Sequence, residues 1–577
     1  MDGAGPSSSH KRPRPSPSAA AAKRPKLDDI IDLTMDDNDT GGSKNNILDA
    51  PLHLFRVRGI PDWANTGFLG AQLSTLVSGA MRWALVSNYM IDMPWLFSAC
   101  PDLVKIPSLL VCHGESGSAA MAIQRSCINA GMNGRYATHS APVPQYGTHH
   151  SKAFFIQYPT GFRVIIHTAN LLYCDINNKS QSVYTQDFPL KDTQSTLSTS
   201  PFERDLLDYI IALKLPPLQA TKVVNIIKMH DFSAARVHLL ASVPSGAAEF
   251  SGAQMNKYGY LKLKSCLENE PGGFPRKFKG APIVCQYSSI GSLSTKWLAS
   301  FIESLSAGKI TGSTNSSLGP PFGGAADPSN IHLIWPTVEE VQNSIEGWFA
   351  GGSIPGYPDK VQRDFLQHYY RRFGGQVAGR QRAMPHMKSY TRFDPETKEI
   401  AWFCVTSHNL SKAAWGEQQE SKKYNCTLLK ILSYELGVLL VPSLEKAYRQ
   451  SRHYGFSCTE NSTTRPQKVA PMAGSENIER VKFLQWQQGE PQAAHFSSDG
   501  TVLTVPLPIP YPLPPESYVQ GQDVPWRVST MFPGVDSLAM TCPGIGTHYG
   551  VTDDMEWENI IEALKGGAGS SLKTLFE

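Results

Sequence analysis

The sequence predicts an α/β protein made of a tail followed by two domains of similar topology. Its 577 residues exceed what a single hydrophobic core usually organises. With 41% hydrophobic and 10% aromatic residues, the composition is that of a folded protein. Among the sixteen histidines, only His150 and His386 have a lysine two positions later, and the residues after both follow one pattern. An internal repeat is therefore expected.

Each histidine–lysine pair is followed by the sequence of a β-hairpin that ends at an asparagine. Turn residues such as Pro159 and Pro395 separate two apolar runs, and the second run leads to Asn170 or Asn409. The four predicted strands are 153–158, 162–167, 389–393 and 400–406. Because side chains alternate along a strand, the histidine and the lysine of each pair should share one face.

The residue types in these two sets indicate phosphoryl chemistry. Imidazole exchanges protons near neutral pH and can also act as a nucleophile. Lysine contributes positive charge and asparagine contributes amide donors, and neither set includes a carboxylate that would hold a metal. Two sets facing each other would bind a phosphoryl group without Mg²⁺. We expect two-step phosphoryl transfer that uses no metal and no other cofactor.

Several segments carry a family resemblance that spans most of the chain from about residue 50. They are 147–150, 166–171, 288–293, 409–416 and 433–437. With the repeated motif, they resemble the phospholipase D superfamily in its variant with asparagine for aspartate, and within it the tyrosyl-DNA phosphodiesterase family. The resemblance implies two α/β/α sandwich domains of similar topology, with the active site between them. We place the N-terminal domain at 49–245 and the C-terminal domain at 246–577.

The resemblance also implies a role for each catalytic residue. His150 attacks the phosphorus and becomes a phosphohistidine. His386 protonates the leaving tyrosine oxygen and then activates water. The groups that bind the non-bridging oxygens are Lys152, Lys388, Asn170 and Asn409.

Two further residues are implied to support the imidazoles. Gln181 matches the residue of the family that orients the catalytic imidazole. Glu435 stands where the family has the glutamate paired with the second histidine, His386. Here the spacer between Gly416 and Tyr434 is longer than the family's, a departure that bears on Glu435.

The resemblance implies DNA contacts as well. Tyr146 matches an aromatic residue that stacks on a base, although a core tyrosine is the alternative. Ser289, Ser292 and Ser411 match positions that hold DNA phosphates; a plain helix cap is the alternative for this loop, and both roles can coexist. Basic segments with interleaved aromatics could add a groove for the DNA backbone or be solvated faces. These segments are 257–264, 275–279 and 369–382.

Other elements follow from apolar spacing and turn residues. In the first domain we expect a helix over 73–89, an exposed loop over 180–200 and a helix over 202–213. Predicted strands are 109–112, 237–243 and 284–287. In the second domain we expect a helix over 296–305, a mobile loop over 308–330 and a short helix over 557–565.

Residues 1–48 form a tail that lacks aromatic residues and should be disordered. The basic clusters 11–14 and 23–26 are spaced like a bipartite nuclear import signal; weak contact with nucleic acid is the alternative. Residues 28–37 place a short apolar run between acidic flanks, like a SUMO-interacting motif, with a plain acidic spacer as the alternative.

The remaining composition restricts the class of protein. Net charge is +3, so a nucleic-acid surface would have to be local. The ten cysteines contain no C-x-x-C pair, which argues against zinc and against a disulfide scaffold. No apolar run approaches ~18 residues, and the N-terminus is unlike a signal peptide. We expect a monomer in the nucleus that does not enter membranes.

The function we expect is DNA repair by hydrolysis of a 3′-phosphotyrosyl bond. The partners would be DNA, preferably single-stranded, and a topoisomerase I-derived peptide, with other blocked 3′ ends also accepted. One alternative is a nuclease or phospholipase of the same superfamily, against which the asparagines, Tyr146 and the nuclear tail argue. A second is a non-catalytic DNA-binding scaffold, which should have lost a histidine or lysine from one set.

Overall fold

The structure is a computed structural model that describes residues 49–192, 199–245, 250–313, 316–323, 327, 329–459 and 470–542. All of these belong to one compact unit, Asn46–Glu577. The predicted import clusters, the SUMO-interacting motif and the helix over 557–565 lie outside the described residues.

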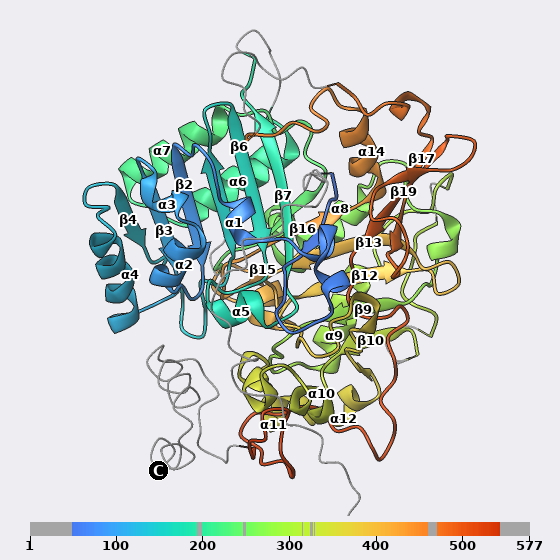
Figure 1. Cartoon of the computed structure of the whole chain (residues 1–577). Coiled ribbons are helices and arrows are strands. Elements are labelled where there is room, and N and C mark those ends of the chain that lie inside the picture. The colour runs from blue at the N-terminus through green and yellow to red at the C-terminus, as the bar shows by residue number, and fades with distance from the viewer. Residues whose placement is uncertain are drawn as a thin grey trace, which may run out of the picture. The chain divides into compact units, whose positions relative to one another are not determined.

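Two large sheets form the framework (Figure 1). The first has the order β1-β7-β6-β5-β2-β3-β4. Its strands are β1 (His53–Leu54), β2 (Trp83–Asn88), β3 (Leu109–His113), β4 (Tyr136–His139), β5 (Ala153–Gln157), β6 (Gly161–His167) and β7 (Ser182–Pro189).

The second sheet has the order β11-β10-β9-β12-β13-β17-β19-β18, and β16 pairs with both β13 and β8. Its strands are β8 (His238–Ser242), β9 (Ile283–Gln286), β10 (Ile331–Ile334), β11 (Tyr370–Arg371), β12 (Ser389–Phe393), β13 (Glu399–Thr406), β16 (Glu435–Leu440), β17 (Arg480–Gln485), β18 (His495–Phe496) and β19 (Val502–Leu507). A separate hairpin consists of β14 (Glu417–Ser421) and β15 (Cys426–Lys430).

The two sheets repeat one topology. The order β4-β3-β2-β5-β6-β7 in the first corresponds to β11-β10-β9-β12-β13-β16 in the second. The first two pairings of each series are parallel and the next three antiparallel. The predicted hairpins are β5–β6 and β12–β13, in equivalent positions. The repeat and the α/β fold class expected from the sequence are confirmed.

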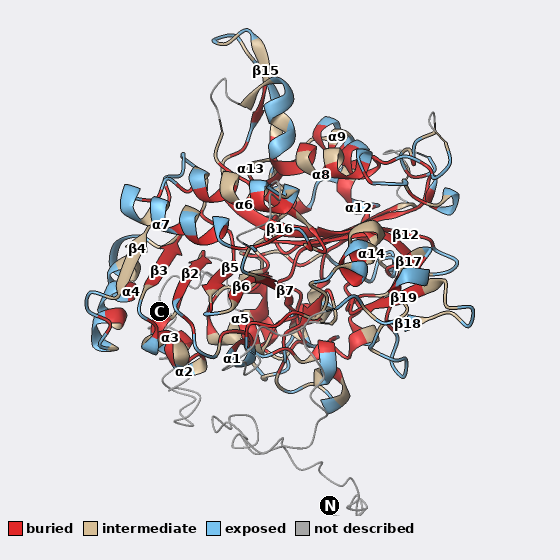
Figure 2. Ribbon diagram, turned by 90° about the horizontal axis from the view of Figure 1, so that it is seen from above, coloured by how far each residue is buried: buried red, intermediate tan, exposed pale blue. Residues whose placement is uncertain are grey.

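Helices cover both faces of the first sheet (Figure 1). One face packs against α1 (Leu73–Leu76), α2 (Met93–Ala99), α3 (Asp102–Lys105) and α4 (Gly117–Asn129). The other packs against α6 (Pro201–Ala212) and α7 (Pro217–Lys228). Figure 2 shows the buried strands between helices whose outer sides are exposed. This is the three-layer arrangement expected for the domain.

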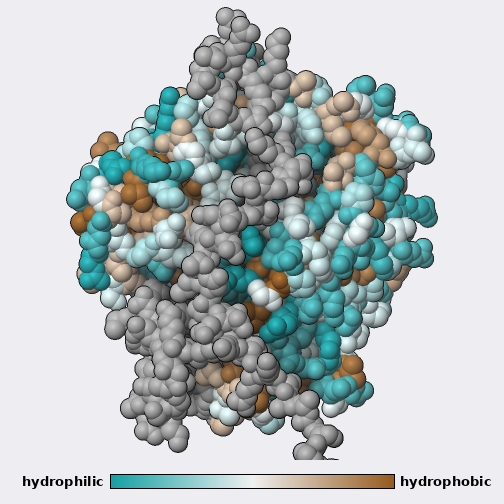
Figure 3. All heavy atoms as spheres, viewed as in Figure 1, coloured by the Kyte–Doolittle hydropathy of each residue, from teal (hydrophilic) through white to brown (hydrophobic). Residues whose placement is uncertain are grey.

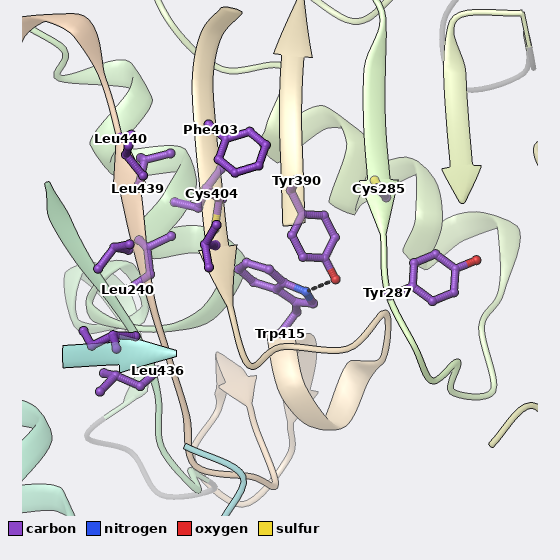
Figure 4. Close-up of a cluster of buried hydrophobic side chains, with 14 of the residues drawn as sticks. Leu240, Cys285, Tyr287, Tyr390, Phe403, Cys404, Trp415, Leu436, Leu439 and Leu440 are labelled. Carbon is purple, nitrogen blue, oxygen red and sulfur yellow. Dashed lines mark hydrogen bonds between the residues drawn. The ribbon is translucent and has the colours of Figure 1, made fainter. Parts of the chain in front are cut away.

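On the second sheet, α8 (Gly259–Glu268) and α9 (Thr295–Leu305) contribute to the core. Helix α9 begins where the Ser294 hydroxyl accepts a hydrogen bond from the amide of Trp297. In Figure 4, Trp415 donates from its indole nitrogen to the hydroxyl of Tyr390, 3.1 Å away. This bond satisfies the indole nitrogen of Trp415, while the Tyr390 hydroxyl itself donates to the carbonyl of His408 at 3.0 Å.

Strand β8 belongs to the first half of the sequence but pairs within the second sheet. It precedes the boundary predicted at residue 245, yet it pairs antiparallel with β16 of the second sheet over five residue pairs. The division into domains at 245 stays a proposal, in which β8 is the strand that the first half contributes to the second sheet.

Two predicted elements of the first half are wrong. The helix expected over 73–89 is only the short α1, because Gly79 has a φ of +96° and the chain then enters β2. The exposed loop expected over 180–200 contains the buried strand β7. Its polar residues are buried because they find partners; Asp187, for example, accepts two hydrogen bonds from the guanidinium of Arg163.

Candidate active site

The two histidine–lysine pairs occupy equivalent places in the repeat. His150 and Lys152 immediately precede β5, and His386 and Lys388 immediately precede β12. Each pair is therefore at the start of the middle antiparallel strand of its sheet. The asparagines lie just beyond the ends of β6 and β13, the strands paired with β5 and β12.

Each histidine segment is bonded to the other half of the repeat. The amide of His150 donates to the carbonyl of Tyr434, 2.8 Å away, at the start of β16. The amide of His386 donates to the carbonyl of Ser180, 3.2 Å away, just before β7. Parallel bridges join His149 to Tyr434 and Ser180 to Pro385. The two sets thus face one another across a shared backbone contact.

Glu435 supports the first histidine. Its carboxylate accepts a hydrogen bond from Nδ1 of His150 at 2.8 Å, and it also accepts one from the hydroxyl of Ser407. The pairing of Glu435 with the second histidine, predicted from the resemblance, is wrong. The physical reason is the crossed backbone: Glu435 follows Tyr434, the residue to which the His150 segment is bonded.

The second histidine is held by the first half. Nδ1 of His386 lies 2.9 Å from the amide nitrogen of Gln181 and 2.9 Å from a carboxylate oxygen of Asp175. The hydroxyl of Thr168 donates to the other end of the Gln181 amide at 2.7 Å. A carboxylate only accepts and an amide nitrogen only donates, so the two contacts need different protonation states of Nδ1. With Nδ1 protonated, the ring donates to Asp175, and Nε2 is the nitrogen available for chemistry.

The equivalent of the Thr168–Gln181 contact in the other half is the contact of Ser407 with Glu435. Thr168 is two residues before Asn170, as Ser407 is before Asn409. Asp175 has no counterpart, since Ala414 stands at the matching distance after Asn409. His386 therefore has both a neutral amide and a carboxylate beside it, whereas His150 has a carboxylate.

Sequence reasoning missed Asp175. It lies on the short helix α5 (Tyr173–Asn177) and is 2% exposed. It also accepts a hydrogen bond from the main-chain amide of Asn170 at 2.5 Å. The available signal was a carboxylate soon after the motif asparagine, with a lysine four residues later, but that spacing is equally typical of an exposed helix. Tyr89 was also missed; its ring packs against that of His150, 5.6 Å between centroids.

Both lysines are fully buried. Nζ of Lys152 donates to the carbonyl of His150 at 2.9 Å, and Nζ of Lys388 donates to the carbonyl of His386 at 2.5 Å. Burial lowers the pKa of Lys152 to about 8. Burial and then the charge of Lys152 lower the pKa of Lys388 to about 7. An anion between them would stabilise both ammonium forms.

The two imidazoles are neutral in this site at neutral pH. Burial lowers the pKa of His386 to about 3, against the opposing effect of Asp175. Burial also lowers the pKa of His150, which Glu435 partly offsets. A neutral imidazole with Nδ1 protonated presents a lone pair at Nε2, as a nucleophile or base requires.

The motif asparagines are oriented through their own neighbours. The side-chain carbonyl of Asn409 accepts hydrogen bonds from the amides of Ser288 at 3.2 Å and Ser289 at 2.9 Å. The side-chain nitrogen of Asn409 remains as a hydrogen-bond donor. Asn170 is held through its main chain by Asp175.

The predicted serines fall together beside Asn409. A Cβ added to Gly291 would meet Cβ of Ser411 at 2.8 Å, so the 288–292 loop and Ser411 are in close contact. The hydroxyl of Ser411 accepts from the amide of Ala414 and caps α13 (Lys412–Trp415). Ser292 is exposed. The helix-cap alternative applies to the 288–292 loop, and it is not confirmed because Ser294, beyond this loop, caps α9. The phosphate-binding roles stay a prediction.

Tyr146 is 83% exposed and has a φ of +65°, so it is not a core tyrosine. The next residue, Gly147, fixes this loop against the second half. A Cβ there would stand 2.1 Å from the carbonyl oxygen of Leu432, a contact that only glycine avoids.

Half of the ten basic residues in the segments expected to form a groove are paired with carboxylates. Each of five lysines and arginines in these segments is ion-paired with a carboxylate, as the pairs Lys257–Asp208, Lys262–Asp205, Lys264–Glu303, Lys277–Glu399 and Arg372–Asp523 show. These five residues stabilise the fold or its surface, and the role of these segments in binding the DNA backbone stays a prediction.

Other features concern metals, thiols and membranes. Within the described ranges, no group of three or more His, Cys, Asp or Glu side chains could hold a metal ion. All ten cysteines are free thiols, eight of them buried. Across the same ranges, every helix is too short or too polar to span a bilayer.

Comparison with known proteins identifies the family. A family profile described as tyrosyl-DNA phosphodiesterase matches residues 51–519. Tyrosyl-DNA phosphodiesterase 1 of Arabidopsis thaliana is 40% identical over 493 residues, covering 84% of this chain and 74% of the relative. The Drosophila melanogaster protein of that name is 32% identical over 377 residues, covering 62% and 60%.

A crystal structure of yeast tyrosyl-DNA phosphodiesterase superposes with a TM-score of 0.56 at 16% identity, covering 83% of this chain and 99% of that one. It shares the fold. The fold and the site together define a class of duplicated α/β proteins in which paired His, Lys and Asn sets meet. Within that class, the chain belongs to the tyrosyl-DNA phosphodiesterase family.

Proposed function

We propose that this protein releases tyrosyl peptides from DNA 3′ ends through a covalent phosphohistidine. Membership of the family gives the reaction class, a phosphodiesterase that acts in DNA repair on blocked 3′ ends. The observation that best supports the residue roles is the crossed arrangement in which Glu435 holds His150 and Asp175 holds His386. Each histidine keeps Nε2 for the reaction.

In the first step, Nε2 of His150 attacks the phosphorus and the bond from phosphorus to the tyrosine oxygen breaks. His386, which gains a proton on binding the anionic substrate, gives that proton to the departing oxygen. The negative charge that develops on the non-bridging oxygens is stabilised by four side chains, Lys152, Lys388, Asn170 and Asn409.

In the second step, neutral His386 takes a proton from water at Nε2. The water oxygen bonds to phosphorus, the phosphorus–nitrogen bond to His150 breaks, and DNA with a 3′-phosphate leaves. His386 is left protonated by this step and loses the proton when the anionic product leaves the site. Glu435 stabilises the positive charge that His150 carries as a phosphohistidine.

We propose that the preferred substrate is single-stranded DNA joined to a topoisomerase I-derived peptide. Exposed Tyr146 would stack on a base, a contact that tolerates any sequence. Ser289, Ser292 and Ser411 would hold phosphates beside Asn409.

The cellular setting belongs to the same proposal. The tail would direct the protein to the nucleus and could carry a strand that SUMO binds. We propose a monomer outside membranes, because the described surface visible in Figure 3 is largely polar, with apolar residues in small groups.

The test is incubation with a single-stranded oligonucleotide that carries a 3′-phosphotyrosine, in EDTA. We expect release of tyrosine and a 3′-phosphate product, because lysines and asparagines supply the charge stabilisation that a metal would otherwise provide. His150→Ala is the inactive control. Turnover that stops in EDTA and returns with Mg²⁺ would contradict the proposed chemistry.

A further inference from the structure

A network of buried charged side chains, Asp175, Lys179 and Glu346, extends from His386. One carboxylate oxygen of Asp175 contacts Nδ1 of His386 at 2.9 Å, and the other is 3.9 Å from Nζ of Lys179. The same ammonium lies 2.9 Å from the carboxylate of Glu346. The side chains of Asp175, Lys179 and Glu346 are at most 6% exposed.

These groups come from both halves of the repeat. Asp175 and Lys179 are on and just after α5, while Glu346 immediately precedes the 3-10 helix Gly347–Ser353 in the second half. The amide of Ile345 donates to the carbonyl of Arg382, 2.8 Å away, which ties the Glu346 segment to the chain leading to His386. The contact between Lys179 and Glu346 therefore spans the same interface as the catalytic sets.

The charges in this network are coupled because water is excluded from around the three side chains. A positive Lys179 attracts the charge of Asp175 and so competes with His386 for it, and Glu346 offsets that competition. The other groups facing Asp175 are the catalytic lysines and the amide of Asn170. The neighbouring thiol of Cys174 stays neutral, since burial raises its pKa to about 12.

We propose that Lys179 and Glu346 are positioning residues that set the proton affinity of His386 through Asp175. This proposal rests on the acid–base role given to His386 above. It predicts that removing either charge alters the proton balance of the reaction although neither residue reaches the substrate.

The two substitutions should act with opposite sign. Lys179→Met leaves Asp175 more available to the protonated imidazole, which raises the proton affinity of His386. Glu346→Gln leaves Lys179 without its counter-charge and lowers that affinity. For single charges that act across a protein interior through one intervening carboxylate, each shift should be on the order of one pH unit.

The experiment measures tyrosine release in single turnovers from pH 5 to 9. Release is fastest when His386 is protonated in the complex with substrate, so the rate falls as pH rises. We expect the midpoint of this fall to move up in Lys179→Met, down in Glu346→Gln, and back toward wild type when both are combined. The matched control is Lys191→Met combined with Glu203→Gln. This ion pair has a buried carboxylate but lies outside the network, so the midpoint should not change.

Shifts of the same sign in both single variants, or no shift in either, would overturn the proposal. If Lys179→Met fails to fold, the nearly isosteric Glu346→Gln decides alone: an unshifted midpoint rejects the role. Failure of the proposed function would be distinct, because the wild-type protein itself would then release no tyrosine.

Discussion

At the scale of residues, the two histidines are alike in position and different in surroundings. His150 has one carboxylate beside Nδ1, whereas His386 has a carboxylate and an amide. The extra polar contacts suit a residue that must gain and lose a proton in each cycle, since the charged and neutral rings must both be held in place. This asymmetry supports the assignment of His150 as nucleophile and His386 as acid and base.

The two histidines should therefore fail differently when replaced. His150→Ala should release no tyrosine and form no adduct, because the nucleophile is missing. His386→Asn should form a phosphohistidine adduct that persists, since the base for its hydrolysis is absent. Some attack survives without the acid because a phenol, with an ordinary pKa of about 10, leaves readily. Denaturing gels of a labelled oligonucleotide measure both outcomes.

An adduct that accumulates with His150 replaced and His386 intact would reverse the two roles. Inversion of configuration at phosphorus, with no adduct in either variant, would indicate direct attack by water.

The paired lysines make substrate binding depend on pH. Lys388 has a pKa of about 7 and Lys152 one of about 8 in the free site, each lowered by burial. Both should be charged when an anion is bound. The contribution of the lysines to the affinity for a 3′-phosphotyrosyl oligonucleotide should thus be constant below about pH 6.5. It should weaken by about tenfold per pH unit between about pH 7 and 8, and by up to about a hundredfold per unit above about pH 8, where both lysines must take up a proton.

Fluorescence anisotropy with His150→Ala, which binds without turnover, measures this dependence. Adding Lys388→Met should weaken binding at pH 6 and move the onset of the pH dependence upward. Affinity that stays flat from pH 6 to 9 would mean that the lysines remain charged in the empty site.

At the scale of elements, the loop before β5 is shaped by the other half of the protein. The carbonyl of Leu432 occupies the space where a side chain on residue 147 would begin, and the amide of Tyr434 donates to the carbonyl of Thr148 at 2.9 Å. The strand that carries Glu435 starts at the same place. A change in this loop should therefore disturb His150 and its carboxylate together.

Gly147→Ala tests this coupling. Because its Cβ would lie 2.1 Å from a backbone oxygen, the loop must move away from the second half. We expect tyrosine release to fall at least tenfold while the circular dichroism spectrum stays native. Gly134→Ala is the control: its φ of +75° costs about 1 kcal/mol, but nothing lies within 4 Å and activity should not change. Equal effects of the two substitutions would contradict the coupling.

At the scale of the whole molecule, a buried network joins residues that are far apart in the chain. Arg236 and Arg449 both donate to the carboxylate of Glu445 and to the main-chain carbonyl of Asp49. The carboxylate of Asp49 accepts from Arg449 at 2.5 Å and from the hydroxyl of Tyr454 at 2.8 Å. These bonds anchor Asp49, the first described residue, to the second half of the chain.

Deletion of residues 1–48 should keep catalysis on purified DNA and abolish nuclear accumulation, since the tail holds both basic clusters and Asp49 is retained. Single-turnover assays and imaging of tagged protein measure these effects. A truncated protein that stays nuclear would reject the import signal.

Glu445→Gln should lower the free energy of unfolding by about 3–5 kcal/mol, because it leaves two buried guanidinium groups without a full counter-charge. Thermal unfolding measures this effect.

The sequence by itself determined the features whose cause is local. Both hairpins follow from apolar runs separated by turn residues, and helix α9 from its apolar spacing. The catalytic sets were found because histidine, lysine and asparagine recur at matched places in the repeat. The family and the reaction class followed from segments of contiguous residues. Each of these signals lies within a few dozen residues of the chain.

Only the tertiary structure decided which residues meet across the repeat. Glu435 contacts His150 rather than His386 because the start of β16 is bonded to the segment before β5. Asp175 and the polar residues of β7 look like surface residues in the sequence, and they are buried because partners distant in the chain satisfy them. Burial and ion pairing depend on segments brought together by folding, which no local pattern specifies.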